Sequence, residues 1–260
     1  MTLERYRDLV FSPLDLPPPP AVDVARLVSW MTWARAEGRK RGLVNAERRY
    51  ESETGRQYPW LVANIALEHP TNAEDSFARE FPEIGRYAAK FPVDRPGWLV
   101  LLAQRGGTDV FLHTDSDGYW GFRFYLANKS HEGLHFHLSR RPSAELPRRA
   151  DDWSSYVDLS AKRYARWPAG NRPFCLNSVR AAHAVDRNTC ELGERIACLV
   201  FPGEALDGKK LLRLLERSTA KYREYQIWHD AARPATRGVA RKDHERAKSG
   251  RRSGRVATTG

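Results

Sequence analysis

Two side chains at the end of one apolar run have the types and the spacing of metal ligands. In "DVFLHTD", His113 and Asp115 stand two residues apart. Side chains two apart in an extended strand share a face, so an imidazole nitrogen and a carboxylate oxygen could reach one ion. Asp117, directly before Gly118, is expected to be a turn residue instead. Taken alone, the pair would equally suit the exposed end of a hairpin.

A third ligand is expected from a neighbouring strand. His183 lies in the small-residue run "AAHAVD", seventy positions after His113. On its own, this histidine would more often be a core or loop residue. With His113 and Asp115 it makes two histidines and one carboxylate, which leave three coordination positions open. Non-heme Fe(II) uses this arrangement to bind a co-substrate and dioxygen together.

Two arginines interrupt apolar strands and need anionic partners. Arg195 opens "RIACLVF" and shares a face with Ala197 and Leu199. An unpaired charge buried there is costly, and a carboxylate would match the guanidinium in bidentate geometry. Arg123 in "GFRFYL" shares a face with Tyr125. It could hold a second carboxylate, from a co-substrate or from a substrate.

Short apolar or alternating runs separated by turn residues predict the elements that position these groups. About eight strands are expected, the number in a double-sheet jelly roll. The predicted fold is therefore mainly β with flanking helices, around a double-stranded β-helix core of the cupin-like kind. The expected strands cover residues 58–67, 97–104, 109–115, 121–127, 133–139, 173–178, 181–186 and 195–201.

Helical patterns and biased segments flank this core. Helices are expected from Asp23, over residues 72–91 with an interruption at Pro82, and over residues 209–228. The chain divides into a Pro-rich arm over 1–20, one domain over 21–231 and a disordered basic tail over 232–260. The long polar segment 139–172 has the length of a functional lid or a disordered insertion.

The ordered set His113, Asp115, His183 and Arg195 resembles the His-x-Asp, His, Arg signature of Fe(II)- and 2-oxoglutarate-dependent dioxygenases. "HTDSDGYWGFRFYL" and "LNSVRAAHAV" are most similar to the aspartyl/asparaginyl β-hydroxylase branch, which includes bacterial free-proline hydroxylases. The resemblance covers roughly residues 97–202. Some members of that branch lack the carboxylate ligand, whereas Asp115 is present here.

The resemblance implies an enzyme with Fe(II), 2-oxoglutarate and O2. Iron would be bound by His113, Asp115 and His183, and Arg195 would pair with the distal carboxylate of 2-oxoglutarate. The implied reaction is hydroxylation of an amino acid, an amino-acid-derived metabolite or a peptidyl side chain.

A rival metal site lies in "SHEGLHFHLS". His135 and His137 are two apart, with His131 and Glu132 just before them. A cupin builds its site from a similar His-x-His pair with a glutamate and a later histidine. No further glutamate follows before Glu145, so histidines at the surface or facing a substrate are favoured instead.

Charge and cysteine content bear on partners and compartment. Of the net charge of +11, much comes from residues 232–260, which hold nine Lys or Arg against two acidic residues. The tail suggests weak contact with nucleic acid, or in an alternative reading a non-catalytic jelly-roll protein that binds an acidic partner through it. Three cysteines without paired spacing, no signal-peptide pattern and no long apolar run predict a cytoplasmic protein outside membranes.

Overall fold

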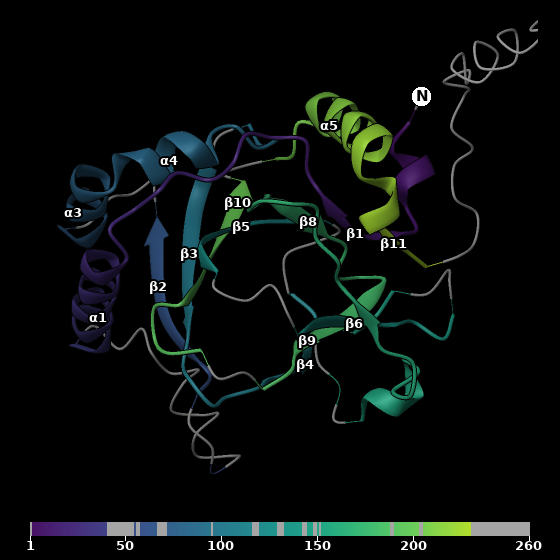
Figure 1. The fold of residues 1–260 in the computed structure, drawn as a ribbon, viewed down its shortest axis with the longest axis horizontal. Coiled ribbons are helices and arrows are strands. Elements are labelled where there is room, and N and C mark those ends of the chain that lie inside the picture. The colour runs from purple at the N-terminus through teal and green to yellow at the C-terminus, as the bar shows by residue number, and fades with distance from the viewer. Residues whose placement is uncertain are drawn as a thin grey trace, which may run out of the picture.

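The computed structural model describes residues 2–40, 55, 58–66, 72–94, 96–115, 120–128, 133–141, 145–147, 150, 152–187, 190–202 and 205–229. Two antiparallel sheets form a jelly roll, as the run pattern predicts (Figure 1). The major sheet has the order β11-β1-β8-β5-β10-β3-β2 and the minor sheet the order β4-β9-β6-β7. The strands are β1 (Leu9–Pro13), β2 (Trp60–Ala66), β3 (Pro96–Gln104), β4 (Val110–His113), β5 (Gly121–Asn128), β6 (Leu134–Leu138), β7 (Arg163–Tyr164), β8 (Phe174–Leu176), β9 (Ala181–Val185), β10 (Arg195–Pro202) and β11 (Ile227–Trp228).

Among the described residues, four α-helices pack outside the major sheet (Figure 1). They are α1 (Val24–Lys40), α3 (Asn72–Glu80), α4 (Pro82–Ala88) and α5 (Gly208–Tyr222). α1 begins where the sequence predicts, with the Asp23 carboxylate accepting a hydrogen bond from the Arg26 backbone N–H at 3.0 Å. Pro82 at the first turn of α4 separates it from α3, because proline has no N–H to continue a helix.

Alternation along β10, and along β5 as far as the register shift that follows Tyr125, divides the apolar side chains between two layers. Phe122 and Phe124 of β5 lie in the layer between the major sheet and the helices. Tyr125 of β5 and Ala197 and Leu199 of β10 lie in the layer between the two sheets. Arg123 and Arg195, in phase with this second group, therefore belong to the inner face of the major sheet.

The structure differs from the prediction near the N-terminus and in the segment that follows α5. The expected N-terminal arm contains β1, whose five residues are all buried in the major sheet, because Leu9 and Val10 pack into opposite apolar layers. The expected helix over 209–228 ends at Tyr222 and is followed by β11, which pairs with β1. These strands form through pairing between residues more than 200 positions apart, which local patterns do not encode.

The described parts of the long insertion cover the outer face of the minor sheet. β7 extends this sheet by pairing with β6. Leu146 and Val157 pack on Ala182 of β9, on the side away from the major sheet. The described residues of the segment thus buttress the minor sheet, where the sequence suggested a lid or a disordered insertion.

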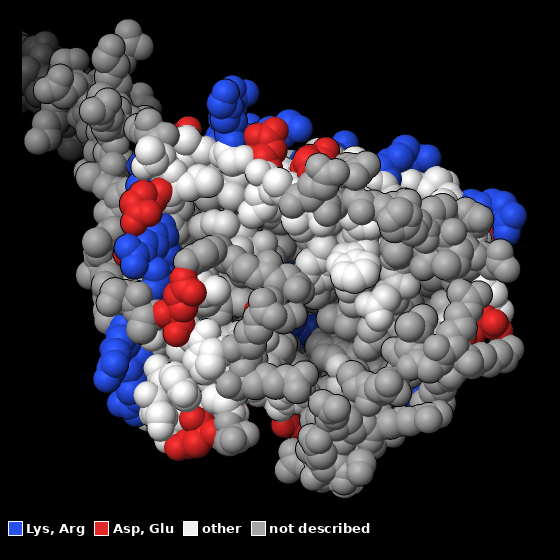
Figure 2. Space-filling model, turned by 180° about the vertical axis from the view of Figure 1, so that it is seen from behind, with Lys and Arg blue, Asp and Glu red and all other residues white. Residues whose placement is uncertain are grey.

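Three further expectations bear on compartment and partners. Cys175, Cys190 and Cys198 are free and buried, as small apolar side chains would be. No helix among the described residues has the length and apolar character needed to cross a bilayer. On the face in Figure 2, the described Lys and Arg side chains lie mainly around the margin among Asp and Glu. The basic tail over 232–260 is outside the described residues.

A candidate metal centre between the sheets

A β-bulge brings the two candidate histidines to one face. Val110 pairs with Val185 and His113 pairs with His183, so two residues of β4 stand opposite one residue of β9. Because of the extra residue, the His113 side chain points to the same inward face as Val110, which packs between the sheets. A bulge of this kind re-aims a side chain without ending the strand. The two imidazole rings consequently lie 4.3 Å apart between centroids.

Asp115 completes a three-residue cluster with these histidines. One ligand atom from each of His113, Asp115 and His183 lies within 4.8 Å of the other two. His113 Nε2 is 3.8 Å from Asp115 Oδ1, and His183 Nε2 is 3.7 Å from Asp115 Oδ2. Among the described residues, this is the group of three or more His, Cys, Asp or Glu side chains with spacing for a metal ion. The geometry is suited to one ion held by two imidazoles and a carboxylate.

The two histidines present free nitrogen lone pairs to this point. His113 Nδ1 lies 2.8 Å from the Phe111 carbonyl oxygen, to which it can donate, and this leaves Nε2 as the ligand atom. His183 is 2% exposed, and neither of its ring nitrogens has a hydrogen-bond partner among the described residues. Burial, reinforced by His113, holds the pKa of His183 well below its usual value. Burial also lowers the pKa of His113. Both imidazoles are therefore neutral at neutral pH, as metal ligation requires.

Two further side chains hold the carboxylate. The Arg123 guanidinium pairs with Asp115 Oδ2, and the Ser178 hydroxyl donates to the same oxygen at 3.2 Å. Burial alone would raise the pKa of Asp115, but Arg123, the two imidazoles and Ser178 outweigh it and hold that pKa well below its usual range. Arg123 thus meets an anion from the chain itself, where the sequence suggested a co-substrate or substrate carboxylate. The role of Ser178 has no signal in the sequence.

Arg195 lies on the same inner face, farther along β10. It is 1% exposed, and its Nη2 donates to the Tyr125 hydroxyl at 3.0 Å. Its guanidinium carbon also lies 5.4 Å from the centroid of the Tyr125 ring. The sequence indicated only that Tyr125 shares a face with Arg123. In the structure, the Tyr125 hydroxyl accepts a hydrogen bond from Arg195 and orients that guanidinium.

The rival histidines face away from this centre. His135 pairs with Ala184 and His137 with Ala182, so both point to the outer side of the minor sheet. Nδ1 of His135 lies 3.0 Å from the Gly133 carbonyl oxygen, and Nδ1 of His137 lies 2.9 Å from that of Asp158. No metal-type cluster among the described residues includes them. His131 and Glu132 lie outside the described residues.

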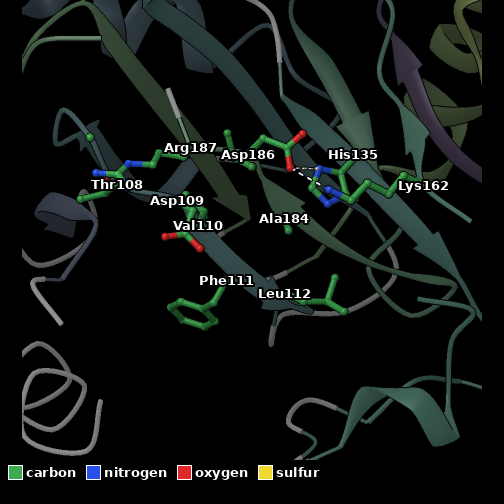
Figure 3. Close-up of a pocket in the computed structure, with 12 residues that line it drawn as sticks. Thr108, Asp109, Val110, Phe111, Leu112, His135, Lys162, Ala184, Asp186 and Arg187 are labelled. Atoms are coloured by element: carbon green, nitrogen blue, oxygen red, sulfur yellow. Dashed lines mark hydrogen bonds and ion pairs between the residues drawn. The ribbon is translucent and has the colours of Figure 1, made fainter. Parts of the chain in front are cut away.

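His135 instead lines an open cavity of about 760 Å³ on the outer face (Figure 3). Asp186 lies beside it and accepts hydrogen bonds from Lys162 and Tyr164, both at 2.9 Å. Burial lowers the pKa of His135. The minor sheet separates this cavity from the cluster of His113, Asp115 and His183.

No protein-family model and no curated protein matches this chain. Among solved structures, EvdMO1 is similar over 76% of this chain and 48% of its own, with 17% identity and a TM-score of 0.42. SnoK, a non-heme alpha-ketoglutarate-dependent carbocyclase from nogalamycin biosynthesis, is similar over 82% and 89%, with 14% identity and a TM-score of 0.36. A prolyl-4-hydroxylase of Pseudomonas putida is similar over 78% and 98%, with 12% identity and a TM-score of 0.35.

This chain spans about half the length of EvdMO1.

Proposed function

We propose that this protein is an Fe(II)- and 2-oxoglutarate-dependent oxygenase. The observation that carries the proposal is the convergence of His113, Asp115 and His183 inside a jelly roll, with both nitrogens of the buried His183 unbonded among the described residues. A buried imidazole without partners is destabilising unless something binds it. Two histidines and one carboxylate leave three positions for a chelating co-substrate and dioxygen, which is the preference of non-heme Fe(II).

Iron bound by these three residues would supply the redox chemistry of the reaction. This chemistry would convert 2-oxoglutarate and O2 to succinate and CO2, with one oxygen atom entering succinate and the other entering a C–H bond of the substrate. The chain provides the geometry. His113 and His183 present neutral nitrogens, while Arg123 and Ser178 hold the Asp115 carboxylate in its ionised form.

Arg195 is the proposed partner of the distal carboxylate of 2-oxoglutarate. Leu199 pairs with Arg123, and Arg195 lies four residues before Leu199 on β10, a separation of about 13 Å along the strand. That length accommodates the arginine side chain and a five-carbon dicarboxylate between it and the metal. The Tyr125 hydroxyl holds the guanidinium in place from the neighbouring strand.

We further propose hydroxylation of an amino acid, an amino-acid-derived metabolite or a peptidyl side chain, as the sequence resemblance to the β-hydroxylase branch implies. Asp115 supports hydroxylation over halogenation, because a halide needs the position of the carboxylate ligand. Three buried free cysteines suit a reducing compartment, and we place the protein in the cytoplasm.

The decisive experiment is an anaerobic titration of the Fe(II)-loaded protein with 2-oxoglutarate. A weak visible charge-transfer band is expected when the co-substrate chelates iron. The band should weaken or shift in Asp115→Ala, which removes a ligand. In Arg195→Ala, a higher concentration of 2-oxoglutarate should be needed to develop the band. His135→Gln, on the outer face, is the matched control and should behave like the wild type. A folded, iron-replete wild type without the band would refute the proposal.

A further inference from the structure

We propose that the site accepts a substrate with a large uncharged apolar portion, a ring system or a hydrocarbon chain, and not a free zwitterionic amino acid. The inference rests on the proposed function and removes one of its three substrate options, the free amino acid, in favour of a substrate with a large apolar portion. Six side chains on the inner face of the major sheet carry it and are called the apolar wall: Val62, Trp98, Val100, Leu102, Leu199 and Phe201.

Alternating exposure along β3 shows that the part of the apolar wall on this strand is open. Leu99, Leu101 and Ala103 are 0% exposed beneath the helices. Trp98 on the opposite face is 53% exposed, and Val100 and Leu102 on that face are only partly buried. β2 and β3 lie at one end of the major sheet (Figure 1). The minor sheet therefore leaves this part of the inner face uncovered, although it seals the part around Tyr125.

Cross-strand pairing makes the wall continuous with the metal centre. Leu199 of β10 pairs with Arg123 on one side and with Val100 on the other. Neighbouring strands are about 4.8 Å apart, so two strand spacings join Val100 to the arginine that holds Asp115. Phe201, two residues further along β10, pairs with Trp98.

A small cavity marks the same connection. About 30 Å³ of space is lined by the polar side chains of Asp115, Arg123 and Ser178. The same space is lined by Trp120, Leu199, Phe201 and Leu206, among others. The carboxylate ligand and the first members of the apolar wall thus border one volume. A substrate carbon placed beside the metal would have its remaining bulk against Phe201 and Trp98.

The charges of the wall exclude a zwitterion as the preferred occupant. Among the described inward-facing side chains of β2, β3 and β10, Arg195 is the charged one, and the proposed function assigns it to 2-oxoglutarate. Arg123 is already paired with Asp115. An α-ammonium group held against this wall would lose its hydration without gaining an anionic partner from the described inward-facing side chains of these strands, which is strongly unfavourable. An apolar ring or chain would instead gain from the burial of Trp98 and Phe201.

Two probes and one pair of variants test the proposal. Calorimetric titrations of the full-length protein, loaded with Fe(II) and 2-oxoglutarate without oxygen, would use 2-naphthol as a neutral two-ring probe and L-proline as a zwitterion. The wild type should bind 2-naphthol and bind L-proline at least about tenfold more weakly. Trp98→Ser should weaken 2-naphthol binding by about tenfold, because it removes the largest apolar surface of the wall.

Trp33→Ser is the matched control. Trp33 lies on α1, outside the major sheet, and is 43% exposed, close to the 53% of Trp98. It should bind 2-naphthol like the wild type. Both tryptophans are substantially exposed, so neither substitution should compromise folding, which circular dichroism would check.

The outcomes separate this inference from the proposed function. A normal charge-transfer band together with 2-naphthol binding that is unchanged in Trp98→Ser, or with tighter binding of L-proline, would overturn the apolar wall. A missing band together with binding that depends on Trp98 would overturn the iron site and still support the wall.

Discussion

His113 and His183 stand directly opposite each other on β4 and β9, with ring centroids 4.3 Å apart, because β4 has one residue more than β9 between its two paired positions. Phe111 and Leu112 together face the interval that Ala184 fills on β9. Val110 and His113 are three residues apart, so in a regular pairing of the same sequence they would lie on opposite faces, because strand side chains alternate. His113 would then face the outer side of the minor sheet. The metal centre thus depends on one irregularity in the minor sheet.

Deletion of Leu112 should retain metal binding, because the extra residue of β4 serves to restore the phase of His113. The shortened strand would pair regularly with β9 and leave His113 two residues after Val110, on the same inward face and opposite His183. Calorimetric Fe(II) titration should give an affinity within about tenfold of the wild type. Leu112→Ala, which keeps the residue count and the bulge, is the control and should also bind Fe(II). Loss of Fe(II) binding in the deletion variant alone would show that the bulge itself is needed to orient His113.

Substitution of His183, which faces inward, and of His135, which faces outward, should have opposite effects on iron binding. His183→Gln should remove Fe(II) binding and succinate formation, because its nitrogen is one of three ligand atoms within 4.8 Å. His135→Gln should retain both, because His135 points to the other side of the sheet. Iron content after dialysis and succinate release would be measured for each variant. Loss of iron in His135→Gln alone would identify the rival site as the metal centre.

Arg123→Met distinguishes two roles for this arginine. If Arg123 holds Asp115, its loss raises the pKa of that carboxyl, because only Ser178 and the two imidazoles then oppose the effect of burial, and Fe(II) affinity at pH 6 should fall by about tenfold. The dissociation constant of 2-oxoglutarate, measured in iron-saturated protein, should change little. A rise in that constant with Fe(II) affinity unaltered would instead assign Arg123 to a co-substrate carboxylate. Arg123→Lys, which keeps the charge, should retain part of the Fe(II) affinity.

The stability of the metal-free protein should fall as the pH drops below about 6.5, the usual histidine pKa. Burial lowers the pKa of both His113 and His183 in the folded chain, so below this pH the unfolded chain binds more protons than the folded one. Each imidazole can contribute up to about 1.4 kcal/mol of lost stability per pH unit. Urea unfolding at pH 7.5 and 5.5, with chelator present, would measure the loss. His183→Gln should reduce it, and an equal loss in the variant would contradict the assignment.

Periodicity in the sequence determined the core strands and, for two of them, which side chains share a face. Alternation in "GFRFYL" and "RIACLVF" places Arg123 and Arg195 opposite the aromatic and aliphatic residues that pack under the helices, and the structure agrees. The spacing of His113 and Asp115 and the later His183 indicated a ligand set, which the fold brings within 4.8 Å. Patterns of this kind are local, because a strand repeats every two residues regardless of its partner.

Only the tertiary structure decided the features that depend on pairing between distant segments. The bulge in β4 is defined by its register against β9, about seventy residues away. Ser178 contacts Asp115 across a separation of 63 positions, and β1 pairs with β11, which lies more than 200 positions later in the chain. The open inner face at Trp98 arises because the minor sheet covers only part of the major one. Residue types and short spacings specify which groups are available, whereas register and coverage result from the packing of the whole chain, which no short window of sequence contains.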